Sequence, residues 1–127
     1  MVEDDPDLVE LLSFNLRTAG FIVATAADGI DVLKKARNSL PDLILLDLML
    51  PELDGFAVCE ILRRDSATAS TPIVIVTAMS SPFARLTGLE AGANDYITKP
   101  FSPKQLIARI QILLAQDTLH PPSFAAS

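Results

Sequence analysis

The chain has 127 residues and half of them are hydrophobic, which is enough for one domain with a substantial core. A net charge of −6 and the lack of a Lys/Arg cluster disfavour direct binding to nucleic acid. No apolar run approaches the ~20 residues of a membrane helix, the N-terminus is acidic, and the single cysteine, Cys59, excludes an internal disulfide. We therefore expect a cytoplasmic protein that does not associate with membranes.

Apolar runs and helical repeats alternate along the chain. Short apolar runs bounded by turn residues predict strands, and apolar residues at helical spacing predict helices. The expected strands are 1–2, 21–25, 42–47, 72–77 and 94–98. The expected helices start at Pro6, run around Val32 to Leu40, cover 56–64 and 82–92, and start again at Pro103. Residues 117–127 are expected to form a flexible tail or the start of a linker. This alternation predicts an α/β fold, a doubly wound parallel sheet with helices on both faces.

Polar side chains follow four of the expected strands. Glu3 and Asp4 follow the first strand, Asp47 ends the third, Thr77 ends the fourth and Lys99 follows the fifth. Because the carboxyl ends of parallel strands meet at one edge of a sheet, these side chains are expected to converge. Oxygen ligands without His or Cys favour Mg²⁺ or Mn²⁺, and a carboxylate beside such an ion, a hydroxyl and an ammonium is suited to receive a phosphoryl group. Each residue alone has a plainer structural explanation, so the prediction depends on their convergence.

Four segments of the sequence resemble the receiver domain of two-component response regulators. They are VEDDP near the start, DLILLDLMLPELDG around Asp47, PIVIVTA around Thr77, and GANDYITKPFSPKQL near the end. The similarity is greatest to the OmpR/PhoB-like class, and it implies one receiver domain over residues 1–116. It also implies a CheY-like, flavodoxin-like (βα)5 fold with strand order 2-1-3-4-5. The implied function is to accept a phosphoryl group from a sensor histidine kinase or a phosphotransfer protein.

The resemblance implies that Asp47 is the phosphoacceptor. It further implies that Glu3, Asp4, Asp47 and the backbone carbonyl of Met49 hold Mg²⁺ or Mn²⁺. Pairing Asp4 with Asp5 in place of Glu3 is an alternative that the spacing to Asp47 disfavours.

Three residues are implied to form the switch. Thr77 supplies the hydroxyl that reaches the phosphoryl group, and Lys99 pairs with that group. The Lys99-Pro100 bond is expected to be cis. Tyr96 is the aromatic residue that turns inward when Thr77 moves, so that phosphorylation remodels the face formed by the last two helices and the last strand.

In the resembled class, that face makes a symmetric dimer. Here Asp95 and Arg109 are expected to pair across it, with Arg85 nearby. Asn94 and Gln105 stand where charged residues are commoner in the class. This face therefore has fewer charged residues to form ion pairs than is usual in the class. Homodimer formation is therefore a hypothesis, which sedimentation can test.

Two departures from the resembled pattern carry expectations. Only Met1 and Val2 precede the acidic pair, so the first strand is short and we expect reduced stability, or a numbering that begins after an upstream segment. Met49 and Met79 flank the phosphoryl position and neither can orient a water molecule. We therefore expect slow self-dephosphorylation.

Three other readings use the same residues differently. A phosphatase of the haloacid-dehalogenase type needs a second Asp two residues after the first, where this chain has Met49. A nucleotide binder would need a glycine-rich loop after the first strand, and none is present. An interaction module that keeps the fold without being phosphorylated stays open, although the full set of acidic, hydroxyl and ammonium residues argues against it.

Overall fold

The computed structural model describes residues 6–24, 26, 28–48 and 54–116. Three strands form a parallel sheet in the order β1-β2-β3: β1 (Ile44–Leu46), β2 (Ile73–Thr77) and β3 (Asp95–Thr98). They are the third, fourth and fifth expected strands, each slightly shorter than predicted. Ile44 lies opposite Ile73, and Ile75 lies opposite Tyr96, so all three strands end at the same edge of the sheet.

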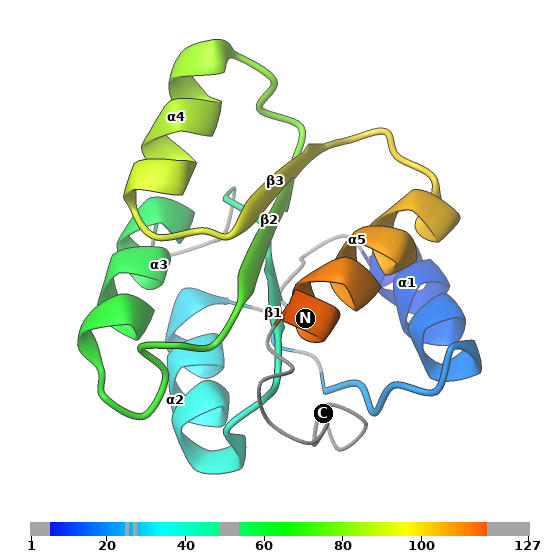
Figure 1. Cartoon of the computed structure of the whole chain (residues 1–127), viewed down its shortest axis with the longest axis horizontal. Coiled ribbons are helices and arrows are strands. Elements are labelled where there is room, and N and C mark those ends of the chain that lie inside the picture. Colours follow the sequence, from blue (N-terminus) through cyan, green and yellow to red (C-terminus); the bar gives the residue numbers. More distant parts are fainter. Residues whose placement is uncertain (1–5, 25, 27, 49–53, 117–127) are drawn as a thin grey trace.

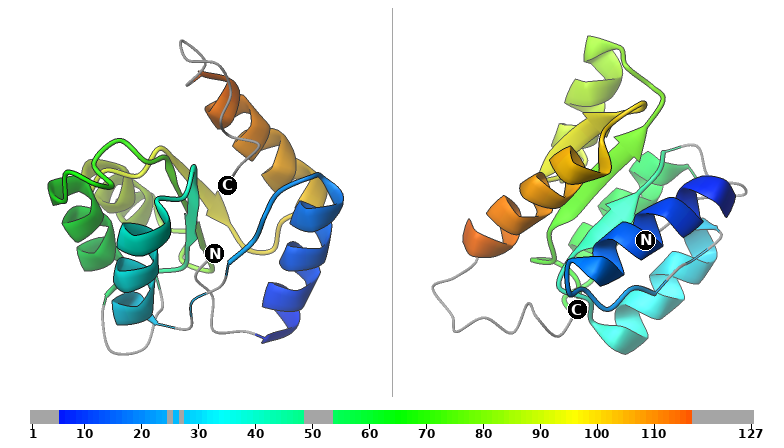
Figure 2. Two further views of the ribbon diagram at one scale, coloured as in Figure 1. Left: turned by 90° about the horizontal axis from the view of Figure 1, so that it is seen from below. Right: turned by 90° about the vertical axis from the view of Figure 1, so that its right-hand side faces the viewer.

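Five helices cover the two faces of this sheet: α1 (Pro6–Thr18), α2 (Gly29–Ser39), α3 (Gly55–Arg64), α4 (Pro82–Glu90) and α5 (Pro103–Gln116). Helices α2, α3 and α4 lie on one face, and α1 and α5 lie on the other (Figures 1 and 2). Parallel strands linked by helices on both faces are the arrangement that the sequence predicts. None of the helices in the described part of the chain is long and apolar enough to cross a membrane.

Short polar side chains define where the helices begin. The backbone N–H of Asp31 donates to Asp28 Oδ1 at 2.8 Å, so α2 begins about one turn before the expected Val32. Asp54 caps α3 and Ser81 caps α4 in the same way, with distances of 2.9 and 3.1 Å. Each cap satisfies a backbone donor that the first helical turn leaves unpaired.

The sheet separates two hydrophobic clusters. Alternate residues of each strand point to opposite faces, so Leu46, Ile75 and Tyr96 belong to the cluster beneath α2, α3 and α4. Leu45 and Ile97 belong to the cluster beneath α1 and α5. All residues of β1 and β2 are buried, as expected for strands covered on both faces.

The expected strand over 21–25 is wrong for its described residues 21–24, which do not form part of the sheet. Its apolar, β-branched composition resembles that of a strand, but a strand also needs a neighbour for its backbone hydrogen bonds. In the order 2-1-3-4-5 the only neighbour is the first strand, and residues 1–2 lie outside the described part.

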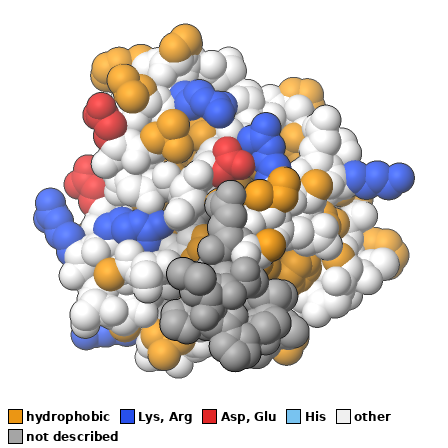
Figure 3. Space-filling model, in the orientation of Figure 1, with side chains coloured by type: hydrophobic (Ala, Val, Ile, Leu, Met, Phe, Trp, Pro, Cys, Tyr) orange, Lys and Arg blue, Asp and Glu red, His pale blue; other side chains and the backbone are white. Residues whose placement is uncertain are grey.

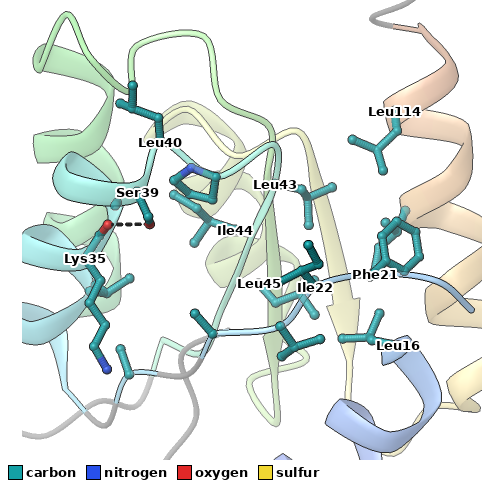
Figure 4. A pocket seen from close by; sticks show the side chains of 17 residues that line it. Leu16, Phe21, Ile22, Lys35, Ser39, Leu40, Leu43, Ile44, Leu45 and Leu114 are labelled. Carbon is teal, nitrogen blue, oxygen red and sulfur yellow. Dashed lines mark hydrogen bonds between the residues drawn. The ribbon is translucent and has the colours of Figure 1, made fainter. Parts of the chain in front are cut away.

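An apolar pocket of about 250 Å³ lies along the edge of β1 that does not face β2. Its lining comes from α2, from β1, from residues 21–24 and from the facing ends of α1 and α5. Figure 4 shows Ile44 and Leu45 on one wall, with Phe21, Leu16 and Leu114 across from α2. This is the place that the order 2-1-3-4-5 assigns to the first strand.

Arg63, in the last turn of α3, connects two loops that are distant in sequence. Its Nε donates to the carbonyl of Gly92 at 2.9 Å, and its Nη1 donates to the carbonyl of Thr71 at 2.6 Å. Its Nη2 donates to Asn94 Oδ1 at 2.7 Å, and that oxygen also accepts from the backbone N–H of Ile73. One guanidinium therefore holds the α3–β2 loop against the α4–β3 turn.

Candidate functional site

Asp47 lies directly after β1, at the edge where the strands end. It is 4 % exposed, and its Oδ2 accepts from the Nζ of Lys99 at 2.8 Å. Lys99 follows β3, 52 positions further along the chain. The fold therefore brings together a carboxylate and an ammonium from separate strands, and burial makes their attraction stronger than in water.

Thr77 is fully buried at the end of β2, between these two residues in sheet order. Its hydroxyl accepts from the backbone N–H of Met79 at 3.3 Å, and its carbonyl accepts from the backbone N–H of Lys99 at 2.7 Å. The Lys99-Pro100 bond is cis, as expected. The ends of β2 and β3 are thus joined directly beside Asp47.

Tyr96 points inward from β3 and is 1 % exposed. Its hydroxyl donates to the carbonyl of Met79 at 2.5 Å. Burial raises the pKa of the phenol above its ordinary value, the Arg85 guanidinium opposes this, and the Asp47 carboxylate adds to it. The phenol is therefore a neutral donor that ties β3 to the loop after β2.

Gly55 contributes to the site in a way that the sequence analysis did not predict. Its backbone N–H donates to the carbonyl of Leu48 at 3.2 Å. A Cβ at this position would lie 2.5 Å from Leu48 Cα and 2.8 Å from the carbonyl oxygen of Asp47. The start of α3 therefore approaches the Asp47 segment so closely that only glycine fits. The signal was the Asp54-Gly55 pair, which marks a turn but does not reveal a close approach.

The residues expected on the dimer face lie on β3, α4 and α5. Arg109 Nη1 forms an ion pair with Asp95 Oδ1 at 3.1 Å within the chain. Arg85 Nη1 donates to the carbonyl of Tyr96 at 3.2 Å, and its guanidinium lies 5.8 Å from the ring centroid. Hydrophobic side chains are exposed on the nearby surface of α4 (Figure 3); those of this helix are Phe83, Leu86 and Leu89.

The expected metal ligands are mostly outside the described residues. Glu3, Asp4 and Met49 fall there, and so does Asp5. Within the described ranges, no group of three or more His, Cys, Asp or Glu side chains is placed to hold a metal ion. The predicted donors are carboxylate and carbonyl oxygens only, which suits Mg²⁺, and Asp47 stands at the sheet edge where they would meet.

Comparison with known proteins shows extensive similarity. Residues 1–111 match the family described as "Response regulator receiver domain". The chain is 46 % identical over 123 residues to the alkaline phosphatase synthesis transcriptional regulatory protein PhoP of Bacillus subtilis, covering 97 % of this chain and 50 % of PhoP. It is 46 % identical over 121 residues to the DNA-binding response regulator MtrA of Mycolicibacterium smegmatis, covering 95 % of this chain and 52 % of MtrA. The chain thus spans about half the length of these relatives.

Solved structures show the same architecture. A putative response regulator from Chloroflexus aurantiacus superimposes with a TM-score of 0.85 at 40 % identity, over 90 % of this chain and 93 % of that one. The BeF3-activated N-terminal receiver domain of Klebsiella pneumoniae RstA gives a TM-score of 0.81 at 36 % identity, over 87 % and 92 % of the two chains. These likenesses confirm the doubly wound α/β fold.

Proposed function

Because the chain belongs to the response regulator receiver domain family, we propose that Asp47 is the residue that accepts its phosphoryl group. The observation that carries this is the buried Asp47–Lys99 contact of 2.8 Å at the carboxyl edge of the sheet. A carboxylate oxygen of Asp47 attacks phosphorus, the bond from phosphorus to the donor breaks, and an acyl phosphate forms. Lys99 compensates the added negative charge, and the Thr77 hydroxyl, at the end of the neighbouring strand β2, is drawn toward it.

Glu3, Asp4, Asp47 and the carbonyl of Met49 would hold Mg²⁺, which supplies positive charge beside the phosphoryl oxygens. The donor is a sensor histidine kinase or a phosphotransfer protein, the partners that receiver domains serve. The output is a change in the face formed by α4, β3 and α5. The negative charge of the chain makes it unsuited to bind DNA itself.

Incubation with acetyl phosphate and Mg²⁺, followed by intact mass measurement, tests this proposal. The wild type should gain the mass of one phosphoryl group, and Asp47→Asn should gain none. Asp54→Asn, which changes an exposed Asp near the site, should gain it like the wild type, and chelation of Mg²⁺ should prevent the gain. An unmodified wild type would favour the alternative of a phosphorylation-independent interaction module.

The same measurement, followed over time, gives the lifetime of the acyl phosphate. Met79 beside the site cannot orient a water molecule, so self-dephosphorylation should be slow. A lifetime of only seconds would contradict this.

We also propose that phosphorylation promotes a homodimer through the face of α4, β3 and α5. Its exposed apolar side chains on α4 support this, and so does the presence of the ion pair between Asp95 and Arg109 on this face. This pair forms within one chain, so the dimer would have to exchange it or extend it. Sedimentation with and without beryllofluoride, a mimic of the phosphoryl group, should show a larger species only with the mimic. A monomer under both conditions would contradict the proposal.

A further inference from the structure

The last turn of α4 contains a buried glycine, Gly88. A Cβ added there would lie 2.8 Å from Ile75 Cδ1, 3.1 Å from Tyr96 Cδ2 and 3.2 Å from Tyr96 Cε2. The first distance is shorter than side-chain contacts normally allow, and the other two are tight. The missing side chain of Gly88 therefore leaves the space in which the Tyr96 ring lies.

Three contacts hold the Tyr96 ring in this space. Gly88 adjoins one ring edge, the Tyr96 hydroxyl donates to the Met79 carbonyl, and Arg85 lies 5.8 Å from the ring centroid. Arg85 and Gly88 are three residues apart and thus lie on the same side of α4. The helix therefore presents a cation and a gap to the same aromatic ring.

We propose that Gly88 is a positioning residue that sets the balance between inward and outward positions of Tyr96. The nearest atom of Ile75 is its terminal methyl, the far end of a flexible side chain, but Ile75 lies in the middle strand and is completely buried, so little free volume surrounds that methyl. Tyr96 can yield, because its ring needs only to give up the Met79 hydrogen bond and turn toward solvent. A side chain at position 88 should therefore displace the ring and leave the sheet intact.

The consequence for signalling rests on the proposed function of Asp47. If the inward ring and the modified Asp47 favour each other, a change that disfavours the inward ring weakens binding at Asp47, at most by the factor by which it shifts the ring equilibrium. An added methyl group in a well-packed core should shift the equilibrium between the inward and outward ring positions by about five- to thirtyfold. Gly88 touches none of the reacting atoms, so its effect would act through the two side chains that a Cβ would meet, Tyr96 and Ile75.

The composition of the chain provides a direct measurement of the ring. Tyr96 is the only tyrosine and there is no tryptophan, so the intrinsic fluorescence reports on this residue. We would compare the wild type with Gly88→Ala, with Ile75→Val, and with the double variant, which removes the 2.8 Å contact with Ile75 Cδ1. Glu90→Ala, an exposed change on the same helix, is the matched control. Acrylamide quenching reports ring exposure, and titration with beryllofluoride in the presence of Mg²⁺ reports binding at Asp47.

We expect Gly88→Ala to expose the ring to acrylamide and to weaken beryllofluoride binding by up to about thirtyfold. The double variant should recover part of both losses, and Glu90→Ala should match the wild type. A protected ring with unchanged beryllofluoride binding in Gly88→Ala would overturn the inference, and so would unfolding of both Gly88 variants. If the wild type does not bind beryllofluoride while Gly88→Ala still exposes the ring, the proposed function fails and the role of Gly88 in positioning the ring stands.

Discussion

Cys59 is the only thiol of the chain and is completely buried in α3. Burial raises the pKa of the thiol, the Arg63 guanidinium opposes this, and Glu60 adds to it. Above the ordinary thiol pKa of about 8.5, the unfolded chain releases a proton that the folded chain retains, so stability falls as the pH rises.

We therefore predict a steeper loss of unfolding free energy between pH 8 and pH 10 in the wild type than in Cys59→Ala. The difference in slope should be at most about 1.4 kcal/mol per pH unit. Urea titrations at several pH values measure it. The variant loses some core volume, so the comparison concerns the two slopes and not the absolute stabilities. Parallel curves would show that the thiol ionises equally in both states.

Single residues also show which parts of the site can be predicted from the sequence and which cannot. Asp47 and Lys99 were predicted to meet because strand topology alone brings their positions to one edge. Gly88 and Gly55 were not recognised, because in each case the atoms that exclude a side chain belong to a different element or loop. Ile75 and Tyr96 define the space at Gly88, and the backbone after β1 defines it at Gly55. No local pattern contains such information.

The connections between elements depend on Arg63, which bonds to the loop that precedes β2 and to the turn that precedes β3. We predict that Arg63→Lys lowers the free energy of unfolding by about 1–3 kcal/mol, because one ammonium cannot reach all the carbonyls that the guanidinium fork reaches. Arg64→Lys, an exposed change at the neighbouring position, is the control and should have little effect. Chemical unfolding of both variants decides this, and equal stabilities would contradict the prediction.

Most elements were predicted within a few residues, because their apolar repeats and caps are local features. The segment at 21–24 was the exception. Its composition is that of a strand, but strand formation is settled by pairing, and pairing depends on a distant partner. Sequence patterns therefore locate helices and buried central strands better than strands at the edge of a sheet.

At the scale of the whole molecule, an apolar pocket of about 250 Å³ lies beside β1 in the described part of the core. For the chain as printed, we predict that adding about five alternating β-branched and apolar residues before Met1 raises the melting temperature. The added strand would bury apolar side chains in this pocket, and each kcal/mol gained corresponds to about 4 °C for a domain of this size. A Gly-Ser extension of equal length is the control, and equal melting temperatures for the two would contradict the prediction.

The sheet acts as a shared wall between two interiors, and Tyr96 belongs to only one of them. Leu12, Ile110 and Leu114 pack in the other, beneath α1 and α5. Substitutions there can raise the stability of the protein without altering the space beside Gly88 in which the Tyr96 ring lies. A protein engineer who wants a robust biosensor could thus redesign one interior for durability and reserve the opposite one for tuning the response.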